Sequence, residues 1–222
     1  MKIDVLTLFP SMFVPFLEQS IIGRAVAEKK VHVQIHNIRD YSVDPHHKVD
    51  DYGFGGGDGM VLMPDPIYRA VDALRREESK IILLTPQGQT FHQSLAYDLS
   101  HEKHLIFICG HYEGFDERIR ALADLEMSIG DYVLTGGELP SMVIMDSIIR
   151  LVDGVIKEGS HTNDSFHEDL LDYPVYTKPR VYRGMEVPDI LFSGHHENIK
   201  NWRRAEQIKR TQERRPDLLE KR

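Results

Sequence analysis

Apolar positions in the first forty residues repeat first with strand-like and then with helix-like spacing. Lys2–Phe9 is a nearly continuous apolar run, which is typical of a buried strand, and Val31–Ile38 alternates apolar and polar residues. Between them, Met12–Lys29 places its apolar residues on one side of a helix, with Pro15 in the first turn, where proline is tolerated. A strand, a helix and a strand in this order predict an α/β protein with a mostly parallel sheet.

Helical patterns continue between the later strands. Asp65 and Pro66 resemble an N-cap followed by proline at the first helical position, and the pattern predicts a helix that ends near Glu78. Phe91–Ser100 has a helical pattern as well. Leu139–Val152 has an apolar face so broad that we expect it to pack against a second subunit as well as against the core.

Three predicted strands lead into glycine. Ile81–Thr85 runs into the sequence PQG, Leu105–Cys109 stops at Gly110, and a shorter apolar run, Met127–Leu134, is followed closely by two glycines. Ligands of α/β sheets bind outside the carboxyl ends of strands, and glycine lets the backbone approach them closely. A glycine after a strand is more often only a turn, but the nearness of the last two loops in sequence suggests one shared pocket.

The last part of the chain is polar and locally basic. Lys157–Pro174 has no apolar periodicity and is interpreted as a linker. The net charge of the chain is −8, yet residues 176–222 hold 12 Lys and Arg against 7 Asp and Glu. Phosphate contacts need only a local basic surface, so this tail is a candidate for binding nucleic acid; the alternative is a solvated basic helix. That helix is expected from about His196, with an apolar stripe of Ile199, Trp202, Ala205 and Ile208.

Composition indicates a soluble protein with a substantial core, because 41% of the residues are hydrophobic and 28% are charged. No apolar run approaches the roughly 20 residues that cross a bilayer. The start of the chain has Asp4 within its apolar run and does not resemble a signal peptide. Cys109 is the single cysteine, which excludes an internal disulfide. We therefore expect a cytoplasmic protein with no membrane partner.

Two long motifs, CGHYEGFDER and SIGDYVLTGGELP, resemble the core of bacterial tRNA (guanine-N1)-methyltransferases of the SPOUT class. Two shorter segments, DDYGFGGGDGM and TPQG, resemble further motifs of the same family. The match is nearly ungapped and is not confined to glycines, which makes it specific. The chain departs from the family pattern at Gly53, Phe54 and His111, where proline, tyrosine and arginine are usual.

The resemblance implies a fold, an activity and partners. The fold is a SPOUT-type α/β domain with a deep trefoil knot at residues 1–157, a linker at 158–175 that carries the catalytic base, and a small α-helical tRNA-binding domain at 176–222. The activity is methyl transfer from S-adenosylmethionine to N1 of guanosine 37 in tRNA, beside the anticodon. The family also implies an obligate homodimer with the active site at its interface.

Methylating N1 of guanine requires a base that removes the N1 proton and a cation near O6, where negative charge develops. Aspartate and arginine suit these two roles. By resemblance, Asp164 of the motif DSF is the base and Arg150, on the preceding helix, is the cation. Without the motif, Arg150 is only a charge at a helix C-terminus and Asp164 a surface acid. The acids that compete for the role of base are Glu158, Glu168, Asp169 and Asp172.

By the same resemblance, the methyl donor binds to backbone groups of the three glycine loops. Ile129 and Leu134 supply an apolar wall, and Glu113 either faces the positive charge of the donor or caps the next turn. No metal site is predicted, because the cluster of His46, His47, Asp50 and Asp51 matches no standard zinc spacing. The predicted donor-binding residues are Pro86, Gly110, Glu113, Ser128, Ile129, Gly130, Asp131, Tyr132, Val133, Leu134, Gly136, Gly137 and Pro140.

Two alternative functions stay open. One is an RNA-binding SPOUT protein without catalysis, which the presence of Arg150 and Asp164 argues against. The other is a SPOUT methyltransferase that acts on ribosomal RNA or on ribose, which has no need for an acid placed at N1. The chain has no GxGxxG after its first strand and no GxxxxGK[ST] loop, which speaks against a Rossmann-type methyltransferase and an NTPase.

Overall fold

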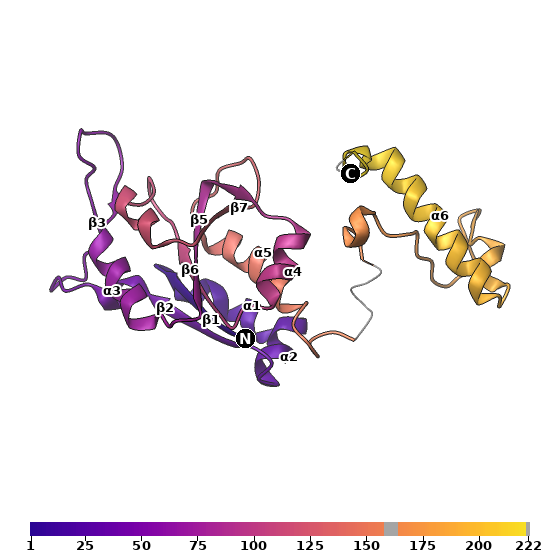
Figure 1. Cartoon of the computed structure of the whole chain (residues 1–222), viewed down its shortest axis with the longest axis horizontal. Helices are drawn as coiled ribbons and strands as arrows, with labels where there is room; N and C mark the ends of the chain where they lie inside the picture. The colour runs from indigo at the N-terminus through magenta and orange to yellow at the C-terminus, as the bar shows by residue number, and fades with distance from the viewer. Residues whose placement is uncertain (158–163, 221–222) are drawn as a thin grey trace. The chain divides into compact units, whose positions relative to one another are not determined.

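The computed structural model describes residues 1–157 and 164–220 of the chain. The chain divides into two compact units, Met1–Lys157 and Glu158–Arg222. Figure 1 shows a sheet with helices in the first unit and one long helix in the second. None of the helices described is both long and apolar enough to cross a membrane.

The first unit is built on a five-stranded parallel sheet (Figure 1). Its strands are β1 (Lys2–Thr7), β2 (His32–Asn37), β5 (Ser79–Thr90), β6 (His104–Cys109) and β7 (Leu125–Ser128), in the order β2-β1-β6-β5-β7. Every neighbouring pair in this sheet is parallel. The carboxyl ends of β6, β5 and β7 therefore lie side by side at one edge. The prediction of an α/β protein with a mostly parallel sheet is confirmed.

Helices cover both faces of this sheet (Figure 1). Ile3, Val5 and Phe107 pack into one apolar cluster, and Leu6 and Ile108 pack into the other. Burial on both faces explains why the strands have nearly continuous apolar sequences. The first cluster includes residues of α1 (Val14–Glu18), α2 (Ser20–Ala27), α4 (Gln93–Ser100) and α5 (Glu138–Ile149), and the second includes residues of α3 (Pro64–Leu74) and the 3₁₀-helix η3 (Glu117–Leu122).

The prediction of a single helix over residues 12–29 is wrong. A 3₁₀ turn, η1 (Pro10–Phe13), leads into α1, and α2 starts after an extended residue, Gln19. Ser20 has a positive φ of 57°. Gly23 permits the sharp turn, because a Cβ at this position would lie 2.5 Å from the backbone carbon of Glu18. The turn between α1 and α2 therefore depends on a close backbone approach that helical periodicity does not reveal.

Two other boundaries also differ from the prediction. Helix α3 has Met63 as its N-cap, so Asp65 lies inside the first turn, where it binds Arg69 of the next turn at 2.9 Å. Pro64 occupies the first helical position, which its restricted φ favours. The helix also ends earlier, at Leu74, because Arg75 is extended.

The sequence PQG after Thr85 was predicted to be a loop that follows a strand, and this is wrong. In the structure it lies within a longer strand. Strand β5 continues through it to Thr90, and its pairing with β7 shifts register between Leu84 and Gln89. A Cβ on Gly88 would lie 2.4 Å from the backbone of Glu126, so the two strands approach each other closely here. The strand-like run predicted to continue to Leu134 instead ends at Ser128.

The second unit centres on helix α6 (His196–Arg214), whose start agrees with the sequence prediction. It also contains the hairpin of β8 (Val181–Tyr182) and β9 (Met185–Glu186). Among its described residues, Leu170, Thr211 and Leu218 are buried. The described part of this unit also contains the 3₁₀-helices η5 (His167–Asp169), η6 (Asp189–Phe192) and η7 (Pro216–Leu218).

Candidate functional site

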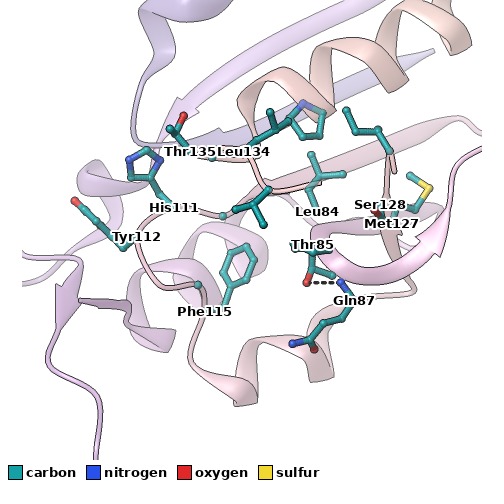
Figure 2. Close-up of a pocket in the computed structure, with 18 of the residues that line it drawn as sticks. Leu84, Thr85, Gln87, His111, Tyr112, Phe115, Met127, Ser128, Leu134 and Thr135 are labelled. Atoms are coloured by element: carbon teal, nitrogen blue, oxygen red, sulfur yellow. Dashed lines mark hydrogen bonds between the residues drawn. The ribbon is translucent and has the colours of Figure 1, made fainter. Parts of the chain in front are cut away.

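A cavity of about 420 Å³ lies at the carboxyl ends of β6 and β7 and beside residues 84–87 within β5. Its walls come from three segments, 84–87, 110–117 and 127–137, and from Arg120 and Pro140. Figure 2 shows side chains of all three segments around this space. The cavity brings together nearly all of the predicted donor-binding residues: Pro86, Gly110, Glu113, Ser128, Ile129, Gly130, Tyr132, Val133, Leu134, Gly136, Gly137 and Pro140. Asp131 is not among the lining residues.

Glycine lets two of these segments touch through their backbones. The N–H of Gly137 donates to the carbonyl oxygen of Gly110 at 2.8 Å. A Cβ on Gly137 would lie 2.7 Å from the Cα of Cys109, and a Cβ on Gly110 would lie 2.8 Å from the ring of Phe115. Any larger residue at Gly137 would force the two segments of the backbone apart. The two segments line one cavity, as the sequence predicted, and the ligand of this cavity stays a prediction.

Several lining residues were missed by sequence reasoning. Leu84 and Met127 belong to the strands themselves, and Phe115, whose ring lies against Gly110, sits inside a quoted motif without a predicted role. Nothing in local periodicity marks these side chains as pocket residues. The other missed members are Thr85, Gln87, His111, Tyr112, Gly114, Glu117, Arg120 and Thr135.

Arg120 joins three segments at the edge of the cavity. Its Nη2 donates to Oε1 of Gln87 at 2.6 Å, and its Nε donates to Oε2 of Glu117 at 3.0 Å. Its Nη1 donates to Oε2 of Glu126 on β7. The guanidinium is about one-fifth exposed, so these contacts are partly shielded from water. Arg120 thus holds the irregular part of β5 against β7 and η3.

The glycine-rich segment at residues 53–59 approaches the same cavity through Glu113. It is closed by a short antiparallel ribbon of β3 (Asp50–Asp51) and β4 (Val61–Leu62). Gly59 has a φ of +84°, and a Cβ there would lie 2.5 Å from Cγ of Glu113. The carbonyl oxygen of Met60 accepts the N–H of Glu113 at 3.1 Å. This segment therefore packs directly against Glu113, an acidic residue that is predicted to contact the donor.

The side chain of His111 packs against two neighbouring aromatic rings. Its ring lies 4.8 Å from that of Phe9 and 5.0 Å from that of Tyr112. Its Nδ1 is buried and has no hydrogen-bond partner among residues 1–157 and 164–220. A Cβ on Gly136 would lie 2.6 Å from this nitrogen and 2.3 Å from Oε2 of the buried Glu138. His111 thus packs close beneath the third glycine loop.

Two buried ionisable groups of the first unit are strongly perturbed. Burial, reinforced by the nearby Glu138 carboxylate, raises the pKa of the Cys109 thiol far above its usual range, so it is protonated and not nucleophilic at neutral pH. Burial also raises the pKa of Asp4, but hydrogen bonds from His36, Lys2 and His104 outweigh it and hold that pKa well below the usual range. Asp4 is therefore an ionised carboxylate inside the fold.

The predicted catalytic pair belongs to two units. Arg150 is the C-cap of α5 in the first unit, and Asp164 is the first described residue of the second. Their joint role stays a prediction. Of the competing acids, Glu158 lies outside the described residues, and Glu168 pairs with Arg204 at 3.0 Å. Asp172 accepts the hydroxyl of Ser165 at 2.8 Å, and Asp169 has a positive φ of 57°.

The histidine- and aspartate-rich segment before the glycine loop is internally paired. Asp51 binds Nζ of Lys48 at 2.7 Å, and Asp44 accepts the N–H of His46 at 2.8 Å. Within the described ranges, no group of three His, Cys, Asp or Glu side chains is arranged to hold a metal ion.

Comparison with known proteins assigns this chain to a well-populated group. The family profile described as tRNA (Guanine-1)-methyltransferase TrmD matches residues 1–221. A tRNA (guanine-N(1)-)-methyltransferase of Staphylococcus epidermidis is 53% identical over 223 residues, covering 99% of this chain and 91% of that protein. Proteins with the same name from Dictyoglomus turgidum and Streptococcus gordonii are 51% and 55% identical, covering 100% and 99% of this chain and 91% and 90% of the relatives.

Proposed function

The chain belongs to the tRNA (guanine-N1)-methyltransferase family and is an enzyme that methylates tRNA, and we propose that its donor is S-adenosylmethionine and its target N1 of guanosine 37. The observation that carries the donor assignment is the cavity formed by the three glycine-containing segments. Its volume of about 420 Å³ falls within the usual range for small-molecule sites, roughly 300–1,000 Å³.

The lining of the cavity fits the chemistry of this donor. Leu84, Met127 and Ile129 offer apolar surface to a purine ring and to the methylene groups of the donor's amino-acid chain. Backbone groups near Gly130 and Gly136 are accessible because these residues have no side chains, so they can bind the polar edges of the purine. The Glu113 carboxylate provides negative charge for the ammonium and sulfonium groups. When bound, S-adenosylmethionine supplies an electrophilic methyl group.

We propose that Asp164 and Arg150 prepare the guanine. Asp164 takes the proton from N1, which makes the nitrogen electron pair available for attack on the methyl carbon. The Arg150 guanidinium binds O6 and stabilises the negative charge that develops there. Arginine suits this role because it stays charged at every physiological pH.

Exposed apolar residues of the first unit support the homodimer. On helix α5, Leu139 and Val143 are 51% and 47% exposed, and Val133 in the third loop is 88% exposed. Exposed apolar residues grouped on one element are typical of a subunit contact. We propose that these surfaces pair with a second copy, that the donor pocket and the Asp164 base of one active site come from different protomers, and that the three pocket segments form the trefoil knot of the family.

A methylation assay with defined RNA tests the proposal. Purified protein is incubated with methyl-labelled S-adenosylmethionine and a tRNA transcript that has guanosine at position 37, and the nucleosides are then analysed. We expect 1-methylguanosine from this transcript and no label from a matched transcript with adenosine at position 37. Label that persists in the adenosine transcript, or that appears on ribose, would disprove the target assignment. The Asp164→Asn variant is assayed in parallel, and we expect it to be inactive.

A further inference from the structure

We propose that Thr211 of helix α6 is a positioning residue that holds the segment carrying Asp164. The inference rests on the proposed role of Asp164 as the base. The segment concerned, residues 164–173, and helix α6 both belong to the second unit. The side-chain hydroxyl of Thr211 connects them.

Thr211 makes two hydrogen bonds from a fully buried position. Its Oγ1 donates to the carbonyl oxygen of Gln207 at 2.7 Å, one turn earlier in α6. The same oxygen accepts the backbone N–H of Leu171 at 2.9 Å, across 40 residues of sequence. The side chain is 0% exposed, and the adjacent Leu170 is 2% exposed. Because the site is buried, loss of the hydroxyl would leave the Leu171 N–H without its partner and away from water.

Other contacts of this segment with α6 are more exposed. Arg204 pairs with Glu168 at 3.0 Å, but both side chains are about half exposed. The Arg203 guanidinium lies 4.7 Å from the centre of the Tyr173 ring. Exposed ion pairs contribute little to stability, so of these three contacts the buried Thr211 bond restricts the segment most.

The backbone between Asp164 and Leu171 is tightly folded, so a constraint at one end is transmitted to the other. The N–H of Phe166 donates to the carbonyl oxygen of Leu170 at 2.6 Å. Ser165 donates to the carboxylate of Asp172 at 2.8 Å and accepts its N–H at 3.0 Å. Three residues have a positive φ, namely Phe166 at 70°, Glu168 at 52° and Asp169 at 57°. This backbone conformation is strained for residues other than glycine.

Such a strained loop persists only where its surroundings hold it, and Thr211 supplies the buried anchor next to Leu170. Asp164 directly precedes Ser165, which closes this loop onto Asp172. Release of Leu171 therefore lets the loop relax and displaces the Asp164 carboxylate. A displacement of about 1 Å in a catalytic group can reduce the rate by about 10²-fold.

The test compares three substitutions at one position. Thr211→Val keeps the branched shape and removes the hydroxyl, Thr211→Ala removes both, and Thr211→Ser keeps the hydroxyl. We expect the methyl-transfer rate at saturating donor and tRNA to fall about 10–100-fold in the valine and alanine variants, with little change in donor or tRNA affinity. Thr211→Ser should retain most of the wild-type rate. Hydrogen exchange at the Leu171 amide should become faster in the first two variants only.

A matched control is Ser193→Ala, which removes an exposed hydroxyl from the same unit. Ser193 donates to the carbonyl oxygen of Ile190 within its own turn. The Ser193→Ala substitution should change neither the methyl-transfer rate nor the hydrogen exchange at the Leu171 amide. If thermal unfolding shows that the valine variant is misfolded, the comparison of alanine with serine decides the question.

Three results would overturn the inference. The first is a wild-type rate in both Thr211→Val and Thr211→Ala, and the second is a serine variant as slow as these two. A loss explained entirely by weaker tRNA binding would also overturn it, because Thr211 would then support RNA contact and not the base. Asp164→Asn is measured alongside. If that variant is inactive while the Thr211 variants are normal, only the positioning role fails, whereas an active Asp164→Asn variant refutes the base itself.

Discussion

Alanine at Gly59 should weaken donor binding by displacing Glu113. Gly59 has a φ of +84°, and a Cβ built there lies 2.5 Å from Cγ and 2.8 Å from Oε1 of Glu113. These atoms belong to the flexible part of a side chain, so the carboxylate can move away while the backbone stays. When the Glu113 carboxylate moves, its negative charge leaves the position from which we propose that it faces the donor.

The size of the effect follows from two separate terms. A non-glycine residue in the left-handed region costs about 1–2 kcal/mol in stability. The loss of a hydrogen bond to a charged group costs about 1.5–3 kcal/mol, which corresponds to about 10–100-fold in the donor dissociation constant. Gly55 separates these terms, because its φ is +89° and nothing lies within 4 Å of its built Cβ.

Calorimetric titration with S-adenosylmethionine measures the difference. We expect Gly59→Ala to weaken binding about 10–100-fold and Gly55→Ala to bind nearly as wild type. Combining Gly59→Ala with Glu113→Gln should add little to either single change, because both remove the same contact. Equal weakening by the two alanine substitutions would show that strain in the glycine-rich segment, and not the position of Glu113, controls the affinity.

Three further predictions follow from the site and the core. Asp164→Asn should slow methyl transfer about 10²–10⁴-fold in single-turnover kinetics without changing donor affinity, whereas Asp169→Asn should have little effect. Arg120→Ala should raise the KM for the donor more than it lowers kcat, and Arg118→Ala, which removes an exposed pair on the same 3₁₀-helix, should change neither. Asp4, whose pKa is lowered in the fold, stabilises the protein above its unfolded pKa of about 3.9 and loses that contribution as the pH falls below it. Denaturant unfolding from pH 6 to pH 3 should therefore show a steeper loss in the wild type than in Asp4→Asn, and equal slopes would contradict this.

Much of the sheet could be predicted from local sequence. Strands buried on both faces must be apolar at successive positions, so Leu105–Cys109 was recognisable as β6 without any partner being known. The pocket loops were recognisable because glycine follows an apolar run in each, and the structure shows that Gly110 and Gly137 lie where one segment packs closely against another. The prediction failed where a helix had to break: Gly23 allows the turn between α1 and α2, yet it fits equally well within a helical pattern.

By itself, then, the sequence determined the α/β class, the positions of the glycines and the motifs that identify the family, because these depend on burial and backbone freedom at neighbouring residues. The tertiary structure alone decided which distant residues meet. Arg120 joins Gln87 to η3, Gly59 presses on Glu113, and Thr211 holds Leu171. Each of these contacts spans more than 30 residues, and it exists only because folding brings those segments together. Periodicity describes a residue's own element and carries no information about the segment that will pack against it.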